Sequence, residues 1–179
     1  MSDEIFYIYG ANGTWIRGDD ELEKWRESGK KYFCLSWQRT TPRTLPEEGK
    51  GFIMYMRYNI HHVQNKELQG KIEFKLHVKK WMKEKPQCNS DSIYFTKCAG
   101  DISADNKVWF IVDKIERVKK TDGEYLILDD FTHPDSKKTI GLRNTIPKVK
   151  RISEELVIET YAHNGTTVTC IPTHQPAWF

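Results

Sequence analysis

Short runs of β-branched and aromatic residues, each followed by residues that favour turns, recur along almost the whole chain. Ile5–Tyr9, Tyr32–Trp37 and Gly51–Tyr58 are among the most apolar of these runs. Short apolar runs bounded by glycine, proline or asparagine are typical of strands. Because about eight or nine such runs stand against one helix signal, the pattern predicts a mixed α+β domain built on a barrel-like sheet.

The helix signal follows Asp19–Asp20. These residues can cap a helix, and Leu22 and Trp25 lie three positions apart on one face of it. Leu68–Leu76 alternates apolar and polar residues, as a half-exposed strand does. Further strands are expected at Val108–Val118, Tyr125–Leu128, Lys148–Ile152, Glu155–Tyr161 and Thr166–Ile171, whereas residues 84–106 are expected to form a loop.

The composition fits one folded domain and argues against several other classes of protein. Hydrophobic residues make up 38% of the 179 residues, enough for a core, but no run approaches the roughly 20 apolar residues of a membrane helix. The acidic start, Met1–Glu4, lacks the features of a signal peptide. Four widely spaced cysteines without a Cys-x-x-Cys pair argue against a zinc ribbon or a disulfide framework. We therefore expect a cytoplasmic protein with free thiols, no membrane contact and no bound metal or cofactor.

The charge of the chain is distributed unevenly. The net charge is only +3, but residues 1–28 carry −4 and residues 30–85 carry +8. A second basic stretch, Lys137–Arg151, contains six basic residues and no acidic one. Two basic zones in a nearly neutral chain are typical of a protein that binds a polyanion, although lysine-rich stretches also occur as solvated surface.

Motifs of the common enzyme classes are absent, with one partial exception. The chain has no Walker A sequence, no Gly-x-Gly-x-x-Gly, no Gly-x-Ser-x-Gly and no His-Glu-x-x-His. His62–Gln64, Leu68–Phe74 and Tyr94–Lys97 follow one another in an order that resembles the replication-initiator endonucleases of the HUH class. That resemblance implies a divalent metal and Tyr94 as a nucleophile. The chain departs from that class at Glu67, where a ligand histidine would be expected. A nuclease of this kind is therefore retained as the alternative function and not as the leading one.

A second pattern covers about residues 5–153 and lies in the order and texture of the strands. The segments that carry it are, in order, Ile5–Tyr9, Cys34–Trp37, Gly51–Tyr58, Leu68–Phe74 with its glycine, Val108–Val112, Ile115–Val118, Gly141–Thr145 and Lys148–Ile152. Together they resemble the EVE/YTH-like domains of the PUA superfold, which bind modified bases in nucleic acid. The resemblance implies a PUA-like mixed β-barrel with a few peripheral helices.

The chain departs from that pattern in two insertions, residues 59–67 and 84–106, and in a C-terminal segment, residues 154–179. With these departures it resembles the N-terminal modified-DNA-sensing domain of McrBC-type restriction systems, some of which read N6-methyladenine. The resemblance implies a base-recognition domain over residues 1–153, followed by a strand extension or the start of a linker. It also implies a motor or nuclease outside this chain as a partner.

The resemblance also suggests which residues would hold the base. A methylated base flipped out of a duplex needs an aromatic slot and a polar group that reads its edge. Trp37, Trp81 and Tyr58 are the expected walls of this slot, and Asn12 and Ser36 are the expected readers of the edge. The expected contacts to the nucleic-acid backbone are Arg39, Arg43, Lys79, Lys80, Lys83, Lys148 and Lys150.

Other interpretations of these residues stay open. A tryptophan is more often a core residue, and we expect that role for Trp25 and Trp109; for Trp37 and Trp81 both roles are retained. The leading hypothesis is a non-enzymatic domain that recognises a modified base in DNA, with RNA as a close second. The other candidates are the HUH-like nuclease using Tyr94 and a protein-binding module.

Overall fold

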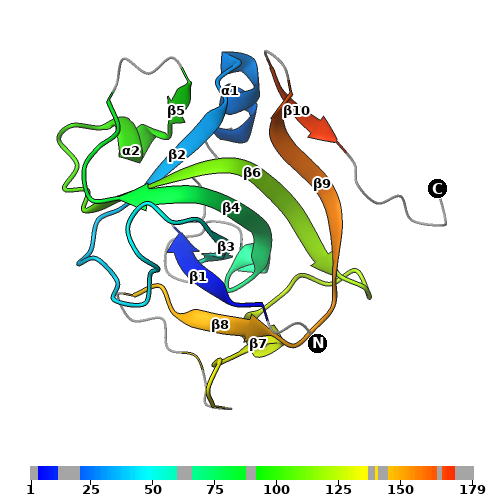
Figure 1. The fold of residues 1–179 in the computed structure, drawn as a ribbon. Helices are drawn as coiled ribbons and strands as arrows, with labels where there is room; N and C mark the ends of the chain where they lie inside the picture. Colours follow the sequence, from blue (N-terminus) through cyan, green and yellow to red (C-terminus); the bar gives the residue numbers. More distant parts are fainter. Residues whose placement is uncertain are drawn as a thin grey trace.

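The computed structural model describes residues 4–11, 21–59, 66–87, 92–136, 140, 145–164 and 167–171. These residues form one ten-stranded sheet with two short helices and two single turns of 3-10 helix (Figure 1). Neither α-helix in these ranges is long and apolar enough to cross a membrane. The elements are β1 (Phe6–Ala11), α1 (Glu21–Ser28), β2 (Tyr32–Trp37), β3 (Phe52–Tyr58), η1 (Lys66–Leu68), β4 (Ile72–Met82), β5 (Ile93–Phe95), α2 (Lys97–Gly100), β6 (Val108–Lys120), η2 (Leu128–Asp130), β7 (Phe131–Thr132), β8 (Lys148–Arg151), β9 (Glu155–Asn164) and β10 (Thr167–Ile171).

The strands follow the order β10-β9-β6-β4-β3-β1-β8-β7, and β2 joins the sheet at β6. The long β6 therefore has β4 on one edge, whereas its other edge is shared by β2 along Val108–Val112 and by β9 along Lys114–Lys120. The pairs β1–β3 and β2–β5 are parallel and the others antiparallel. The sheet curls strongly (Figure 1), but its strand pairing does not close into a barrel in the described ranges. The expected α+β class is confirmed at this level.

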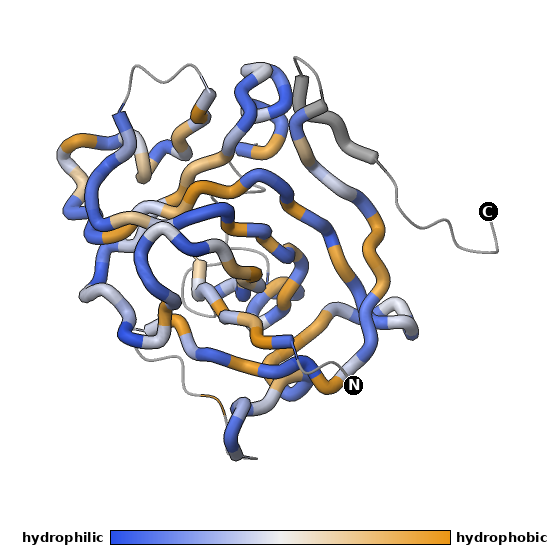
Figure 2. The backbone as a smooth tube through the Cα atoms, in the orientation of Figure 1, coloured by the Kyte–Doolittle hydropathy of each residue, from blue (hydrophilic) through white to orange (hydrophobic). Residues whose placement is uncertain are grey.

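The main core fills the concave side of the curled sheet. Alternate residues of each strand point to opposite faces, and Figure 2 shows the resulting change between apolar and polar residues along the strands. In β2 the inward residues are Phe33, Leu35 and Trp37, all buried in one cluster with Trp25 of α1. The expected core role of Trp25 is thus confirmed.

Two smaller cores lie on the convex side. One contains Phe6, Tyr55 and Phe131 and joins β1 and β3 to β7 and β8. The other contains Cys34 and Trp109, and β5 and α2 contribute Phe95 and Ala99 to it. The described residues between β4 and β6 therefore cover one part of the outer face, and Trp109 is a core residue as expected.

Most strand predictions are confirmed, but three are wrong in detail. The strand expected at Leu68–Leu76 runs instead from Ile72 to Met82 as β4, so Leu68 ends a 3-10 turn and Trp81 lies within the strand. Residues 84–106 contain β5 and α2 and are not only loop. Tyr125–Leu128 forms a single bridge, at Leu126, before a 3-10 turn. Its apolar residues are used to cover the outer core rather than to extend the sheet.

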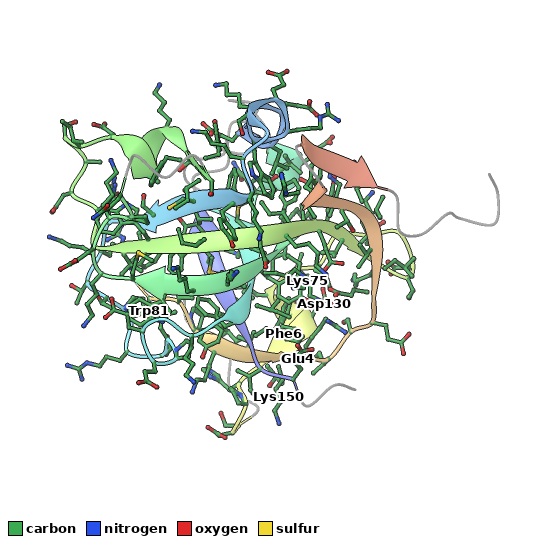
Figure 3. All side chains as sticks on the ribbon, turned by 45° about the horizontal axis from the view of Figure 1, so that its top comes forward. Glu4, Phe6, Lys75, Trp81, Asp130 and Lys150 are labelled. Carbon is green, nitrogen blue, oxygen red and sulfur yellow. The ribbon has the colours of Figure 1, made fainter. Side chains whose placement is uncertain are left out.

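A cluster of polar side chains attaches the start of β9 to the rest of the domain. Glu155 accepts a hydrogen bond from the Tyr55 hydroxyl at 2.7 Å and one from the Lys75 ammonium at 2.6 Å. The Arg151 guanidinium lies 3.2 Å from the same carboxylate and donates to the Tyr55 hydroxyl at 2.8 Å. Lys75 Nζ and the guanidinium carbon of Arg151 also each lie 5.4 Å from the centre of the Phe6 ring; Lys75 and Phe6 are labelled in Figure 3. Residues 155–171 thus extend the sheet as β9 and β10, while residues 172–179 lie outside the described ranges.

Candidate nucleic-acid interface

An irregularity in the pairing of β4 with β6 decides which side chains of β4 face outward. The register shifts on both sides of Val78. Strict alternation from the inward residues Leu76 and Val78 would turn Lys80 inward and Trp81 outward. Instead, Lys79 and Lys80 are both exposed and Trp81 is buried. The irregularity therefore places an indole in the core directly beside two cations on the surface.

The connection between β2 and β3, residues 38–51, is attached to two tryptophans, and we call it the covering loop. The Trp37 Nε1–H donates to the Thr40 carbonyl oxygen at 3.3 Å, and the Trp81 Nε1–H donates to the Pro46 carbonyl oxygen at 2.9 Å. The two tryptophans are only 8% and 5% exposed. Both indoles thus use their single donor to hold the same loop.

The covering loop also approaches β4 closely along its backbone. The Gly49 N–H donates to the Trp81 carbonyl oxygen at 3.1 Å. A Cβ atom on Gly51 would lie 2.9 Å from the Val78 carbonyl oxygen and 3.0 Å from that of Lys79. Since neither contact involves a flexible side chain, glycine at position 51 permits the loop to lie against the strand.

Tyr9 of β1 is the aromatic residue beside Trp37 that sequence reasoning missed. Its ring centre lies 5.6 Å from that of Trp37, and its hydroxyl donates to the Ser36 carbonyl oxygen at 2.8 Å. Burial raises the pKa of the Tyr9 phenol well above its ordinary range, so the hydroxyl remains a donor. The signal that could identify it is the alternation of Tyr7 and Tyr9 in the first strand, which places both on the inward face.

Ser36, an expected edge reader, is not brought together with Trp37. Adjacent residues of a strand point to opposite faces, and Ser36 pairs with Trp109, which belongs to the outer cluster. The Ser36 Oγ is buried and has no hydrogen-bond partner among the described residues. Asn12, the other expected reader, lies outside the described residues.

Tyr58, the third expected wall, is also distant from the covering loop. It ends β3, whereas the loop enters β3 at Phe52, so the two positions are separated by roughly 20 Å along the strand. The Tyr58 hydroxyl is buried and donates to Glu73 Oε1 at 2.7 Å. The structure therefore brings together Trp37 and Trp81, but not Tyr58.

The predicted backbone contacts fall into two separate groups. Lys148 and Lys150 lie on β8, which β3 and β1 separate from β4, and Figure 3 shows Lys150 far from Trp81. The other group is exposed on the covering loop and at the end of β4, and it includes one residue that sequence reasoning omitted, Lys50. Its members without an ion pair in the described part of the chain are Arg39, Arg43, Lys50, Lys80 and Lys83.

Lys79, also of this group, is bonded to an aromatic residue of β2. Its ammonium donates to the Tyr32 hydroxyl at 2.9 Å, and Lys31 and Lys79 lie 5.5 and 5.1 Å from the centre of the Tyr32 ring. The hydrogen bond from Lys79 is the main cause that lowers the pKa of the Tyr32 phenol. Sequence reasoning missed Tyr32 because β6 lies between the two strands, so only the register brings them together.

The residues of the alternative nuclease are described only in part. The Tyr94 hydroxyl donates to Glu21 Oε2 at 2.6 Å, and the Tyr94 ring stacks on Phe33 with centres 5.9 Å apart. His62–Gln64, which would bind the metal, lies outside the described residues. Within the described ranges, no group of three histidine, cysteine, aspartate or glutamate residues is placed to hold a metal ion.

The geometry therefore singles out one end of the sheet, where two indoles hold a loop, and where the loop and the end of β4 carry five cations without an ion pair among the described residues. Comparison with known proteins adds no family to this description, since the chain matches no protein-family model, no curated protein and no solved structure.

Proposed function

We propose that this chain is a recognition domain, not itself a catalyst, which binds a modified base of DNA at the end of the sheet where Trp37 and Trp81 lie. One observation carries the proposal. Two tryptophans donate their indole N–H groups to carbonyls of the same loop, and this loop and the adjoining end of β4 carry five cations that form no ion pair with described residues.

The loop would have to move for a base to reach the indoles, because both are buried under it. Each indole–carbonyl hydrogen bond has a net value of about 1 kcal/mol, so opening the loop at these two points costs about 2 kcal/mol. Stacking of one base on an aromatic residue is worth about 1–3 kcal/mol. The exchange is therefore close to balanced, and the hydrogen bonds of the base edge decide which base is accepted. A methyl group that fills the slot, with Tyr9 beside Trp37, would favour a methylated base.

The surrounding cations would supply the affinity for the phosphate backbone. If these five cations neutralise one phosphate each, the logarithm of the binding constant falls with the logarithm of salt concentration with a slope of about −4.5 on duplex DNA. These contacts carry no base information, so they would act equally on modified and unmodified DNA.

The proposal includes a wider context for this function. The curled sheet and the strand order are compatible with a PUA-like, EVE/YTH-type domain that serves as the specificity module of a modification-dependent restriction system. The motor and nuclease would then belong to a partner or to another domain. The C-terminal strands β9 and β10 would extend the recognition domain toward that partner.

The experiment is a binding panel measured by fluorescence anisotropy at low salt. The panel contains DNA single strands and duplexes with and without N6-methyladenine, and the corresponding RNA. We expect the methylated DNA to bind at least about tenfold more tightly than unmodified DNA. Equal affinity for both would refute base recognition, no binding would refute nucleic-acid binding, and a preference for RNA would move the proposal to RNA.

Matched variants locate the site. Trp81→Phe removes the donor that holds the covering loop, and Trp109→Phe removes a comparable donor, at 3.2 Å from the Ala99 carbonyl oxygen, on the outer face. Only Trp81→Phe is expected to change the selectivity for the methylated base. For the charges, Lys80→Gln is expected to weaken all DNA equally and Lys24→Gln, on α1, is expected to have no effect. An equal loss of selectivity in Trp81→Phe and Trp109→Phe, or an equal loss of DNA affinity in Lys80→Gln and Lys24→Gln, would contradict the assignment of the site.

A further inference from the structure

Arg57 of β3 is a half-buried cation without a partner in the described part of the chain. Its Nε atom is buried and has no hydrogen-bond partner, and none of the ion pairs formed by described residues includes it. Burial alone lowers the pKa of its guanidinium from the ordinary value, and no neighbouring carboxylate offsets this effect. Burial of the Nε–H donor without a hydrogen bond is unfavourable, and an acceptor bound to the guanidinium would offset the partial burial of its charge.

The neighbours of Arg57 on the two adjacent strands offer it no acceptor. It pairs with Gly10 of β1 on one side and with Ile72 of β4 on the other. Strand alternation places Arg57 on the outer face, together with Tyr55. The nearest acid along β4, Glu73, is already bonded to Tyr58 at 2.7 Å and lies 3.6 Å from the Arg117 guanidinium.

Gly10, the partner of Arg57 on β1, leaves open space on the same face of the sheet. No described atom lies within 4 Å of the position that a Cβ atom on Gly10 would occupy. A larger residue at position 10 would point to the same face as Arg57, because the two residues are direct partners in the pairing of β1 with β3. The glycine and the arginine thus combine an open space with an unused fork of donors.

We propose that Arg57 and the space at Gly10 form a binding site for one phosphate group on the outer face of β1 and β3. The guanidinium fork binds two oxygens of a phosphate at once, which is the geometry that favours arginine over lysine. The site is distinct from the one at Trp37 and Trp81, because Arg57 lies near the end of β3 that is remote from the covering loop. That the phosphate belongs to nucleic acid rests on the proposed function, whereas the site itself does not.

The test follows the Nε–H signal of Arg57 by NMR in the full chain labelled with ¹⁵N-arginine, with Arg57→Lys used to assign it. Inorganic phosphate, adenosine monophosphate and a DNA single strand are each titrated at constant ionic strength, with acetate as the control anion. We expect a saturable shift with a phosphate-containing probe and none with acetate. No saturable shift with any of the three probes, or an equal shift with acetate, would overturn the proposal.

Two variants extend the test and separate it from the proposed function. Because Arg57→Gln lacks the Nε–H signal, phosphate binding of the variants is measured by isothermal titration calorimetry. Arg57→Gln is expected to weaken phosphate binding at least about tenfold, whereas Arg43→Gln, at an exposed position of the covering loop, is expected to leave it unchanged. Equal loss in both variants would show a general charge effect and refute the site. The wild-type titration remains decisive if Arg57→Gln fails to fold. If phosphate binds at Arg57 but no oligonucleotide binds to the chain, the phosphate site is supported and the proposed function is refuted. If the Arg57 Nε–H signal shifts with the oligonucleotide alone, the phosphate that binds there is one of nucleic acid.

Discussion

Replacing Glu155 by glutamine tests whether its carboxylate holds the C-terminal strands to the domain. The change keeps the size and shape of the side chain and removes one negative charge. In the folded chain that charge lies between the Lys75 ammonium and the Arg151 guanidinium, at 2.6 and 3.2 Å. Glu154→Gln is the matched control, because Glu154 is exposed and is the preceding residue.

The expected loss of stability follows from how little water reaches this cluster. The side chains of Lys75, Arg151 and Glu155 are 13%, 17% and 7% exposed. Removing one partner of a buried ion pair costs about 3–5 kcal/mol, because the remaining charges are left uncompensated. Glutamine can still accept one hydrogen bond from Tyr55, so we expect the lower end of this range, about 3 kcal/mol. For a chain of this length that corresponds to a decrease in Tm of roughly 6–12 °C.

The assay is equilibrium unfolding in urea at pH 7, with the free energy of unfolding compared among wild type and the two variants. Glu154→Gln is expected to change it by less than about 0.5 kcal/mol, as surface substitutions usually do. The difference between the variants should persist in 1 M salt, because a buried pair is screened much less than an exposed one. Equal stabilities of Glu155→Gln and Glu154→Gln, or a difference that salt abolishes, would refute the reasoning.

Two further substitutions test the approach of the covering loop and the polar outer face. Gly51→Ala is expected to lower the free energy of unfolding, measured in urea, by about 1–3 kcal/mol, because its Cβ would lie 2.9 Å from the Val78 carbonyl oxygen. Gly10→Ala, whose Cβ meets no described atom within 4 Å, should be nearly neutral. Equal losses of stability in the two variants would contradict the close approach of the covering loop to β4. For Glu116, burial raises the pKa, but the hydrogen bond and charge of His77 outweigh it and set the pKa below its ordinary value. The resulting stabilisation is complete above the unfolded-state pKa of about 4.3 and is lost as the pH falls through the lower folded value. The stability difference between wild type and Glu116→Gln should therefore be present at pH 7 and decrease toward pH 3, whereas a difference independent of pH would exclude this origin.

The strands could be predicted well because their signals are local. The limits of β2 were predicted exactly as the structure has them, and those of β1, β3, β6 and β8 to within a few residues. The same local signals failed for Tyr125–Leu128, where burial against an outer core and not strand pairing determines the apolar residues. Composition and alternation cannot distinguish these two causes of an apolar run.

The candidate site depended on relations that local sequence does not contain. Trp37 and Trp81 were predicted together, but the reason that Trp81 is inward is the register shift at Val78, which no propensity reveals. The resemblance places Ser36 in one pocket with Trp37, although adjacent residues of a strand point to opposite faces. Arg57 was counted only as one of many charges, since its burial and its missing partner depend on residues from three strands.

The position of β6 has a consequence for how the chain folds during synthesis. One of its edges needs both Tyr32–Trp37 and Glu155–Asn164, so the second half of that edge stays open until the residues up to Asn164 have left the ribosome. The pairing of Phe6 with Val149 likewise closes only after more than a hundred further residues have been made. Such distant pairings slow folding and leave strand edges exposed to other chains. A nascent chain that ends near residue 153 should therefore depend on chaperones, and release from them should coincide with the appearance of β9.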